Sequence, residues 1–100
     1  MTKEEKEKIR ELVNRRRHQI LVHSCIYYYY DLNIIDDNTF DRWCNELLDL
    51  QAKYPEICKK VRWHKPFTEK FSHASGFNLP YSHKRIRSRA ESILRARGML

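Results

Sequence analysis

The residues most capable of chemistry lie in one stretch, residues 25–50, where four consecutive tyrosines precede an Asp-rich turn. Four successive side chains point in every direction around a helix, so they cannot all face one core. Two interpretations stay open. In the first, Tyr27 and Tyr30 face a second helix, while the other two tyrosines flank the core and keep their hydroxyls in water. In the second, the rings form part of a stacking pocket for a small molecule.

Basic side chains dominate the C-terminal end of the chain. Of the net charge of +7, residues 59–100 contribute eleven Lys and Arg against two Asp and Glu, whereas residues 31–58 carry two against seven. A helix here would bury Ile86 and Ala90 and direct its basic residues outward. These anion- or partner-binding candidates are Lys84, Arg85, Arg87, Arg89, Arg95 and Arg97. Such a face is either simply solvated or meets phosphates or an acidic protein surface, and "RRRH" at 15–18 adds a second basic cluster.

Other classes of site find little support. The aspartates of residues 36–41 are more simply a helix cap and solvated carboxylates than a calcium site, since no loop of oxygen ligands follows. The histidines lack zinc-type spacing, so we predict no metal. Three cysteines without a Cys-x-x-Cys pair indicate reduced thiols in a cytoplasmic protein. No apolar run approaches the roughly 20 residues of a membrane span, and the charged N-terminus argues against a signal peptide.

Helical periodicity predicts an all-α protein built on a long antiparallel hairpin of two helices. A Thr-x-x-Glu capping box at Thr2 would start the first helix, over about residues 3–31. Asp36 or Asp37 would cap the second helix, which should end near Lys53 or Tyr54 because Pro55 follows.

The rest of the chain is expected to complete the same domain. Residues 56–81 have no clear period, and within them residues 61–71 are predicted to be an extended aromatic segment that covers the open side of the hairpin. Ser82 is a plausible cap for a basic third helix, with Gly98 past its end. We therefore divide the chain into a hairpin, residues 1–57, and an irregular loop with a basic helix, residues 58–100, packed as one domain.

The stretch "IYYYYDLNIIDDNTFDRWCNELLDLQAKYPE" resembles the small N-terminal helical domain, domain Ia, of bacterial NAD-dependent DNA ligases. The similarity covers about residues 9–57 without a gap. The positions that fit the family's pattern are Tyr27, Tyr28, Asp31, Ile35, Asp37, Phe40, Asp41, Glu46, Leu47, Leu50, Tyr54, Pro55 and Glu56. Separately, "SGFNLP" at 75–80 resembles the tail of short phage-encoded proteins that are related to ligases.

The resemblance implies a pocket for a nicotinamide nucleotide, because domain Ia closes over the nicotinamide mononucleotide (NMN) half of NAD. Carried over position by position, the pocket residues would be Tyr27, Tyr28, Asp37, Phe40 and Asp41. Aromatic faces can stack on the nicotinamide cation, and carboxylates can accept hydrogen bonds from ribose hydroxyls. The sequence departs from the family at Phe40, where a tyrosine is usual, and in the turn "LNIID", which lacks the family's proline.

Catalysis is not expected, because the chain has no Lys-x-Asp-Gly motif to supply the lysine nucleophile of ligation. We therefore predict a phage-type accessory protein that acts by binding and requires no cofactor. Its expected partner is a host protein of nucleic-acid processing or defence, such as a DNA ligase or a CRISPR-type nuclease that it would inhibit. The alternatives are an NMN- or NAD-binding module and, third, direct binding of DNA or RNA.

Overall fold

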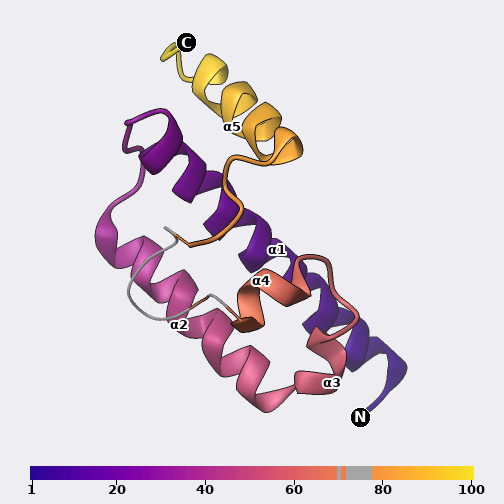
Figure 1. Cartoon of the computed structure of the whole chain (residues 1–100). Coiled ribbons are helices and arrows are strands. Elements are labelled where there is room, and N and C mark those ends of the chain that lie inside the picture. The colour runs from indigo at the N-terminus through magenta and orange to yellow at the C-terminus, as the bar shows by residue number, and fades with distance from the viewer. Residues whose placement is uncertain (70, 72–77) are drawn as a thin grey trace.

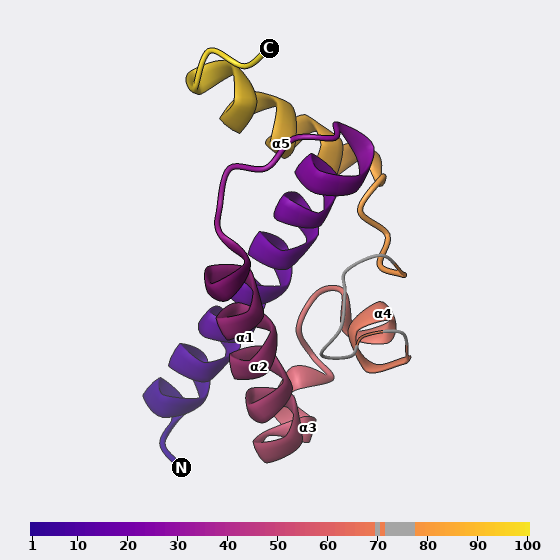
Figure 2. The ribbon, with the colours of Figure 1, turned by 90° about the vertical axis from the view of Figure 1, so that its left-hand side faces the viewer.

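The computed structural model describes residues 1–69, 71 and 78–100, and these residues are helical with no strand, which confirms the all-α class (Figure 1). Along the chain, the elements are α1 (Lys3–Ser24), the π-helix η1 (Cys25–Tyr29), α2 (Asp37–Lys53), α3 (Pro55–Cys58), α4 (His64–Glu69) and α5 (Lys84–Ala96). The long α1 and α2 run side by side as an antiparallel hairpin, α3 and α4 lie near its N-terminal end, and α5 crosses the other end (Figures 1 and 2).

Both hairpin helices begin where short polar side chains satisfy the first backbone amides. The Thr2 hydroxyl accepts a hydrogen bond from the Glu5 N–H at 3.1 Å, and the Asp36 carboxylate accepts one from the Thr39 N–H at 2.6 Å. These caps use donors that have no partner inside the helix. At the other end, α2 stops at Lys53 and Pro55 opens the short α3, because proline is tolerated only in the first turn of a helix.

The sequence period suggested an α-helix that continues to residue 31, but the α-helix ends at Ser24. From Cys25 it widens into a π-helix, in which the Tyr30 N–H donates to the Cys25 carbonyl at 3.2 Å, five residues back. Asp31 then takes a left-handed conformation at φ 56° and ends the helix. This wider turn lets the four tyrosines contact different parts of the molecule, and π-turns of this kind often lie at functional sites.

The extended segment predicted for residues 61–71 is wrong, because α4 occupies most of it. Pro66 lies within the first turn of α4, where backbone amides have no helical partner to lose. The Thr68 hydroxyl donates to the His64 carbonyl at 3.0 Å, and Phe67 is fully buried. The burial of Phe67 in the core therefore determined the structure of this segment, which is too short to show a helical period.

Burial of an arginine, rather than of apolar residues alone, joins the helices. Arg17 has no exposed surface. Its guanidinium donates to the Gln51 side-chain oxygen at 2.8 and 3.1 Å and to the carbonyls of Cys58, Val61 and Arg62 at 3.1–3.3 Å. It also lies over the Phe67 ring, 5.8 Å from the centroid. One side chain of α1 thus holds α2, α4 and the turn between α3 and α4.

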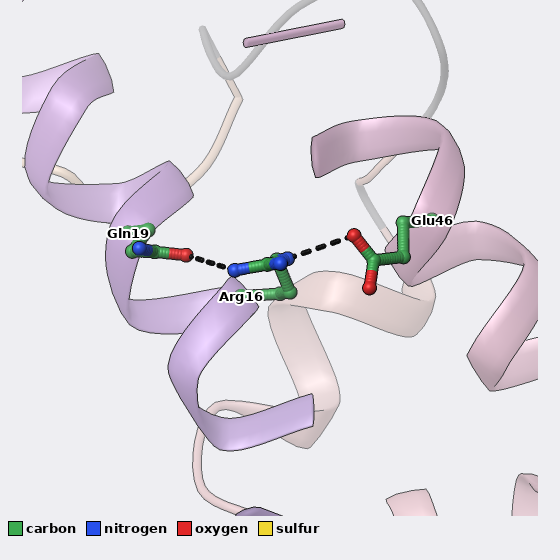
Figure 3. A network of polar contacts seen from close by, with 3 residues as sticks. All are labelled: Arg16, Gln19 and Glu46. Atoms are coloured by element: carbon green, nitrogen blue, oxygen red, sulfur yellow. Dashed lines mark hydrogen bonds and ion pairs between the residues drawn. The ribbon is translucent and has the colours of Figure 1, made fainter. Parts of the chain in front are cut away.

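The neighbouring Arg16 makes a second, more solvated link across the hairpin. Its guanidinium pairs with Glu46 of α2 at 2.9 Å and donates to Gln19 at 2.7 Å (Figure 3). The same group lies 6.0 Å from the centre of the Trp43 ring. The predicted basic cluster at 15–18 is therefore wrong as a surface: Arg16 and Arg17 hold the fold together, and Arg15 is the exposed arginine of the three, beside Glu11.

The basic helix α5 packs on the end of α1 and on η1 through Ile86, Ala90 and Leu94, which are fully buried. It begins at Lys84, with His83 rather than Ser82 as its cap: the His83 Nδ1 atom accepts a hydrogen bond from the Arg85 N–H at 3.2 Å. Gly98 follows its end at φ 71°, as the sequence predicted. Glycine is the residue that adopts this conformation at least cost.

We predict that Asp36→Ala lowers the melting temperature by a few degrees at pH 7. The hydrogen bond from the Thr39 backbone amide lowers the pKa of Asp36 below its ordinary value of 3.8. A carboxyl whose folded pKa is depressed stabilises above its unfolded pKa and loses that contribution as pH falls through the folded pKa. The difference from wild type should therefore shrink below about pH 4. Thermal melts between pH 7 and pH 2.5 measure it; the exposed Asp49→Ala is the control, and an equal shift in that variant would contradict the cap.

Candidate nucleotide-binding pocket

A pocket of about 300 Å³ lies where η1, the connection to α2 and the first turn of α2 meet. The end of α1 and η1 supply one wall, and Leu32 to Asp36 of the connection supply another. The left-handed turn at Asp31 makes this geometry possible, because it sends the chain back from η1 toward the N-terminus of α2. The pocket is therefore built at the open corner of the helical hairpin.

The structure brings all five of the residues predicted to bind a nucleotide to this pocket: Tyr27, Tyr28, Asp37, Phe40 and Asp41. Tyr27 is 54% exposed, so most of its ring is free to meet a ligand. Phe40 is half-buried and packs against the core from the first turn of α2. Two aromatic side chains from different elements thus border one space, and their role in binding stays a prediction.

The four tyrosines divide between this pocket and the contact with α5. Tyr28 packs edge-on against Tyr27, with ring centres 4.9 Å apart, and also lies against Tyr81. The Tyr30 hydroxyl donates to Glu91 of α5 at 2.9 Å, and Tyr29 stacks under Arg87, 5.5 Å from ring centre to guanidinium. The expectation that Tyr30 faces α2 is therefore wrong. Both a packing role and a pocket-lining role are present in the same run.

Carboxylates lie along the side of the pocket formed by α2. Asp36, Asp37 and Asp41 all line it and are exposed. One oxygen of Asp36 is used by the helix cap, which leaves the other two aspartates for a ligand. A row of carboxylates next to aromatic faces favours a cationic, hydroxyl-bearing ligand over an anionic one.

His23 and Ser24 are among the pocket residues that were not predicted. They lie one helical turn before Tyr27 and Tyr28, so the spacing i−4 could have placed them on the same wall. Burial lowers the pKa of His23 to about 4, and the nearby charge of Arg97 acts in the same direction. The His23 ring also packs against Trp43, with centres 5.3 Å apart. The imidazole is therefore neutral at pH 7.

The second candidate surface, the basic side chains of α5, is only partly as expected. Lys84, Arg85, Arg89, Arg95 and Arg97 are exposed. Arg87 is not directed outward: it donates to the Tyr29 hydroxyl at 3.2 Å, and this hydrogen bond raises its pKa. We call the five exposed residues the basic α5 surface.

Within the described part of the chain, no group of three or more His, Cys, Asp and Glu side chains is arranged to hold a metal ion. The three cysteines are buried free thiols, and burial raises the pKa of Cys25 to about 11 and that of Cys44 to about 12. None of the helices described is long and apolar enough to cross a membrane. Among the residues that the structure describes, the pocket and the basic α5 surface are the two candidate binding sites that the sequence predicted.

Comparison with known proteins places the hairpin in a family. Residues 5–60 match the model of the DNA ligase-like, N-terminal NAD⁺-binding domain. A DNA ligase of Mycoplasmopsis synoviae is 48% identical over 52 residues, which is 52% of this chain and 7% of the ligase. A DNA ligase of Pseudothermotoga lettingae is 37% identical over 51 residues, which is 51% of this chain and 8% of the ligase.

The chain therefore spans less than a tenth of the length of these relatives. No solved structure gives a significant match. The matched residues run from the first turn of α1 through α3 and include every side chain that lines the pocket. Because the family model covers more than half of the sequence, this chain belongs to the family of DNA ligase-like, N-terminal NAD⁺-binding domains.

Proposed function

We propose that the protein binds the nicotinamide mononucleotide part of NAD, or NMN itself, in the pocket between η1 and α2. The observation that supports this is the convergence of Tyr27, Phe40 and two aspartates, from separate elements, on one cavity within a domain of an NAD⁺-binding family. Capture of a protein partner, which the sequence analysis placed first, now ranks second. Nucleotide binding ranks first because the residues of the pocket support it.

The chemistry of the pocket fits the nicotinamide riboside part of this ligand in charge and in size. A nicotinamide ring is a planar cation, and stacking on Tyr27 or Phe40 contributes about 0.5–2 kcal/mol each. Asp37 and Asp41 accept hydrogen bonds from ribose hydroxyls and offset the charge of the ring. A volume of about 300 Å³ is at the lower end for ligand pockets, so it suits a mononucleotide better than a whole dinucleotide.

Isothermal titration calorimetry tests the proposal directly. We expect saturable heat with NMN and with NAD, and none with AMP, which carries only the adenine half of NAD. Absence of heat with NMN at millimolar ligand would remove the proposed function. Binding of AMP as strong as that of NMN would show a general nucleotide site rather than a nicotinamide site.

A second candidate function is capture of an acidic protein of nucleic-acid processing, such as a ligase or nuclease, by the basic α5 surface. The described ion pairs involve none of its five side chains, so their charge is available to a partner. The same surface is the candidate for direct contact with DNA or RNA phosphates. Both partners require positive charge on α5, and they differ in whether nucleic acid must be present.

We expect Arg89→Glu with Arg95→Glu to abolish capture of the partner from a bacterial lysate treated with nuclease. The control is Lys3→Glu with Lys8→Glu, which makes the same change of charge at exposed positions of α1. Equal loss in both pairs would show a general charge effect and contradict an α5 interface. Capture that disappears on nuclease treatment alone would instead identify nucleic acid as the partner.

A further inference from the structure

Two buried polar atoms on the wall of the pocket have no hydrogen-bond partner among the described residues. They are the Ser24 hydroxyl oxygen and the His23 Nδ1 atom. Ser24 as a whole is only 1% exposed. Both residues lie on the last turn of α1, directly before η1, so their backbone is held by regular helical geometry.

Such atoms are uncommon in folded proteins, because a buried polar group without a partner loses its bonds to water and gains nothing in return. A buried serine in a helix ordinarily donates to the carbonyl one turn earlier, and Ser24 does not. The His23 ring is packed against Trp43, which restricts its rotation toward another partner. Both residues line the pocket, so a small rotation of either side chain would turn its partnerless atom toward a group that enters the pocket.

We propose that Ser24 and His23 bind the carboxamide of the nicotinamide ring and so distinguish it from nicotinic acid. The Ser24 hydroxyl donates to the amide oxygen, and the His23 Nδ1 atom, with the proton on Nε2, accepts from the amide NH₂. This assignment rests on the proposed function and names the residues that would give the site its specificity.

The character of the two groups selects an amide over an anion. A primary amide presents one acceptor and two donors, which matches a hydroxyl beside an unprotonated ring nitrogen. His23 is neutral because burial lowers its pKa to about 4. A carboxylate has no hydrogen to give to Nδ1, and the aspartates that line the same pocket would repel it. The matching of a buried donor and acceptor is what allows a site to reject a close analogue.

Calorimetric titrations with NMN and with nicotinic acid mononucleotide test the proposal. Wild type should bind NMN at least about tenfold more tightly than the acid. Ser24→Ala and His23→Phe should each weaken NMN binding by about tenfold and leave the weak binding of the acid unchanged. Phenylalanine keeps an aromatic ring beside Trp43 and removes both ring nitrogens. Ser88→Ala, on the exposed face of α5, should leave the affinity for NMN as in wild type.

The melting temperature of the ligand-free variants gives a second, independent measurement. Removing a hydroxyl without a partner should leave the melting temperature of Ser24→Ala equal to that of wild type or raise it, since alanine also favours the helix. A clear decrease would show that the hydroxyl supports the fold and would overturn the assignment.

The titrations separate failure of this assignment from failure of the proposed function. If NMN binds equally well to wild type and to both variants, the NMN site stands and the carboxamide contacts are wrong. Equal affinity of wild type for NMN and its acid has the same meaning. If NMN does not bind at all, the proposed function falls and the carboxamide assignment falls with it.

Discussion

Arg17→Ala is expected to cost about 3–5 kcal/mol of unfolding free energy, the largest effect of any single substitution considered for this chain. The change leaves the carbonyls of Cys58, Val61 and Arg62 without the donor that satisfies them in the core. It also leaves a cavity beside Phe67. In a domain of this size the melting temperature should fall by about 15 °C or more. Urea unfolding followed by circular dichroism measures the free energy.

The matched control is Arg15→Ala, two residues earlier on the same helix. Arg15 is 56% exposed and lies 3.9 Å from Glu11, so its removal should change the free energy of unfolding by less than about 0.5 kcal/mol. Arg17→Lys should remain clearly destabilised, since an ammonium cannot reach Gln51 and three carbonyls at once. A loss below about 1 kcal/mol in Arg17→Ala would show that water replaces the guanidinium and that Arg17 does not hold the helices together.

Tyr27→Ala is expected to weaken NMN binding by about tenfold. The ring lines the pocket but is 54% exposed, so the substitution removes a stacking face with little effect on the core. The melting temperature without ligand should therefore stay close to that of wild type. Calorimetric titration of the variant with NMN, beside a thermal melt, measures both quantities.

Tyr29→Ala is the matched control, because it removes the same side chain from the same π-helix outside the pocket. Tyr29 is 48% exposed and contacts Arg87 of α5 instead of the cavity. It should leave NMN affinity unchanged and lower the melting temperature slightly through the lost contact with α5. If the two variants weaken binding equally, the effect comes from a disturbed η1 and not from stacking by Tyr27.

Much of the candidate site could be located from the sequence because it depends on local signals. The short turn between two helical periods predicts an antiparallel hairpin, and the resemblance to domain Ia placed Tyr27, Phe40 and Asp41 at its corner. Asp36 as a cap and Pro55 as the end of α2 follow from backbone hydrogen bonding alone. The similarity to domain Ia suggested the ligand of this corner, and the family whose model matches the chain is one of NAD⁺-binding domains.

The π-turn of η1 could not be predicted, because its sequence fits an α-helix equally well. Residues of η1 and its cap contact α5: Tyr30 pairs with Glu91, and Tyr29 pairs with Arg87. These partners lie about 60 residues away in the chain. A local period carries no information about partners so distant in sequence, so the direction of each tyrosine was open until the helices packed.

The sequence alone was enough for the helical class, the start of α1 and both ends of α2, since each follows from signals within a few residues. The five side chains at the corner of the hairpin were predicted from the resemblance to domain Ia. Packing in three dimensions decided the burial of Arg17, the helix at His64–Glu69 and the partnerless atoms of His23 and Ser24. Whether a polar group is exposed, satisfied or left without a partner depends on all the elements around it. These neighbouring elements come together only when the helices pack against one another.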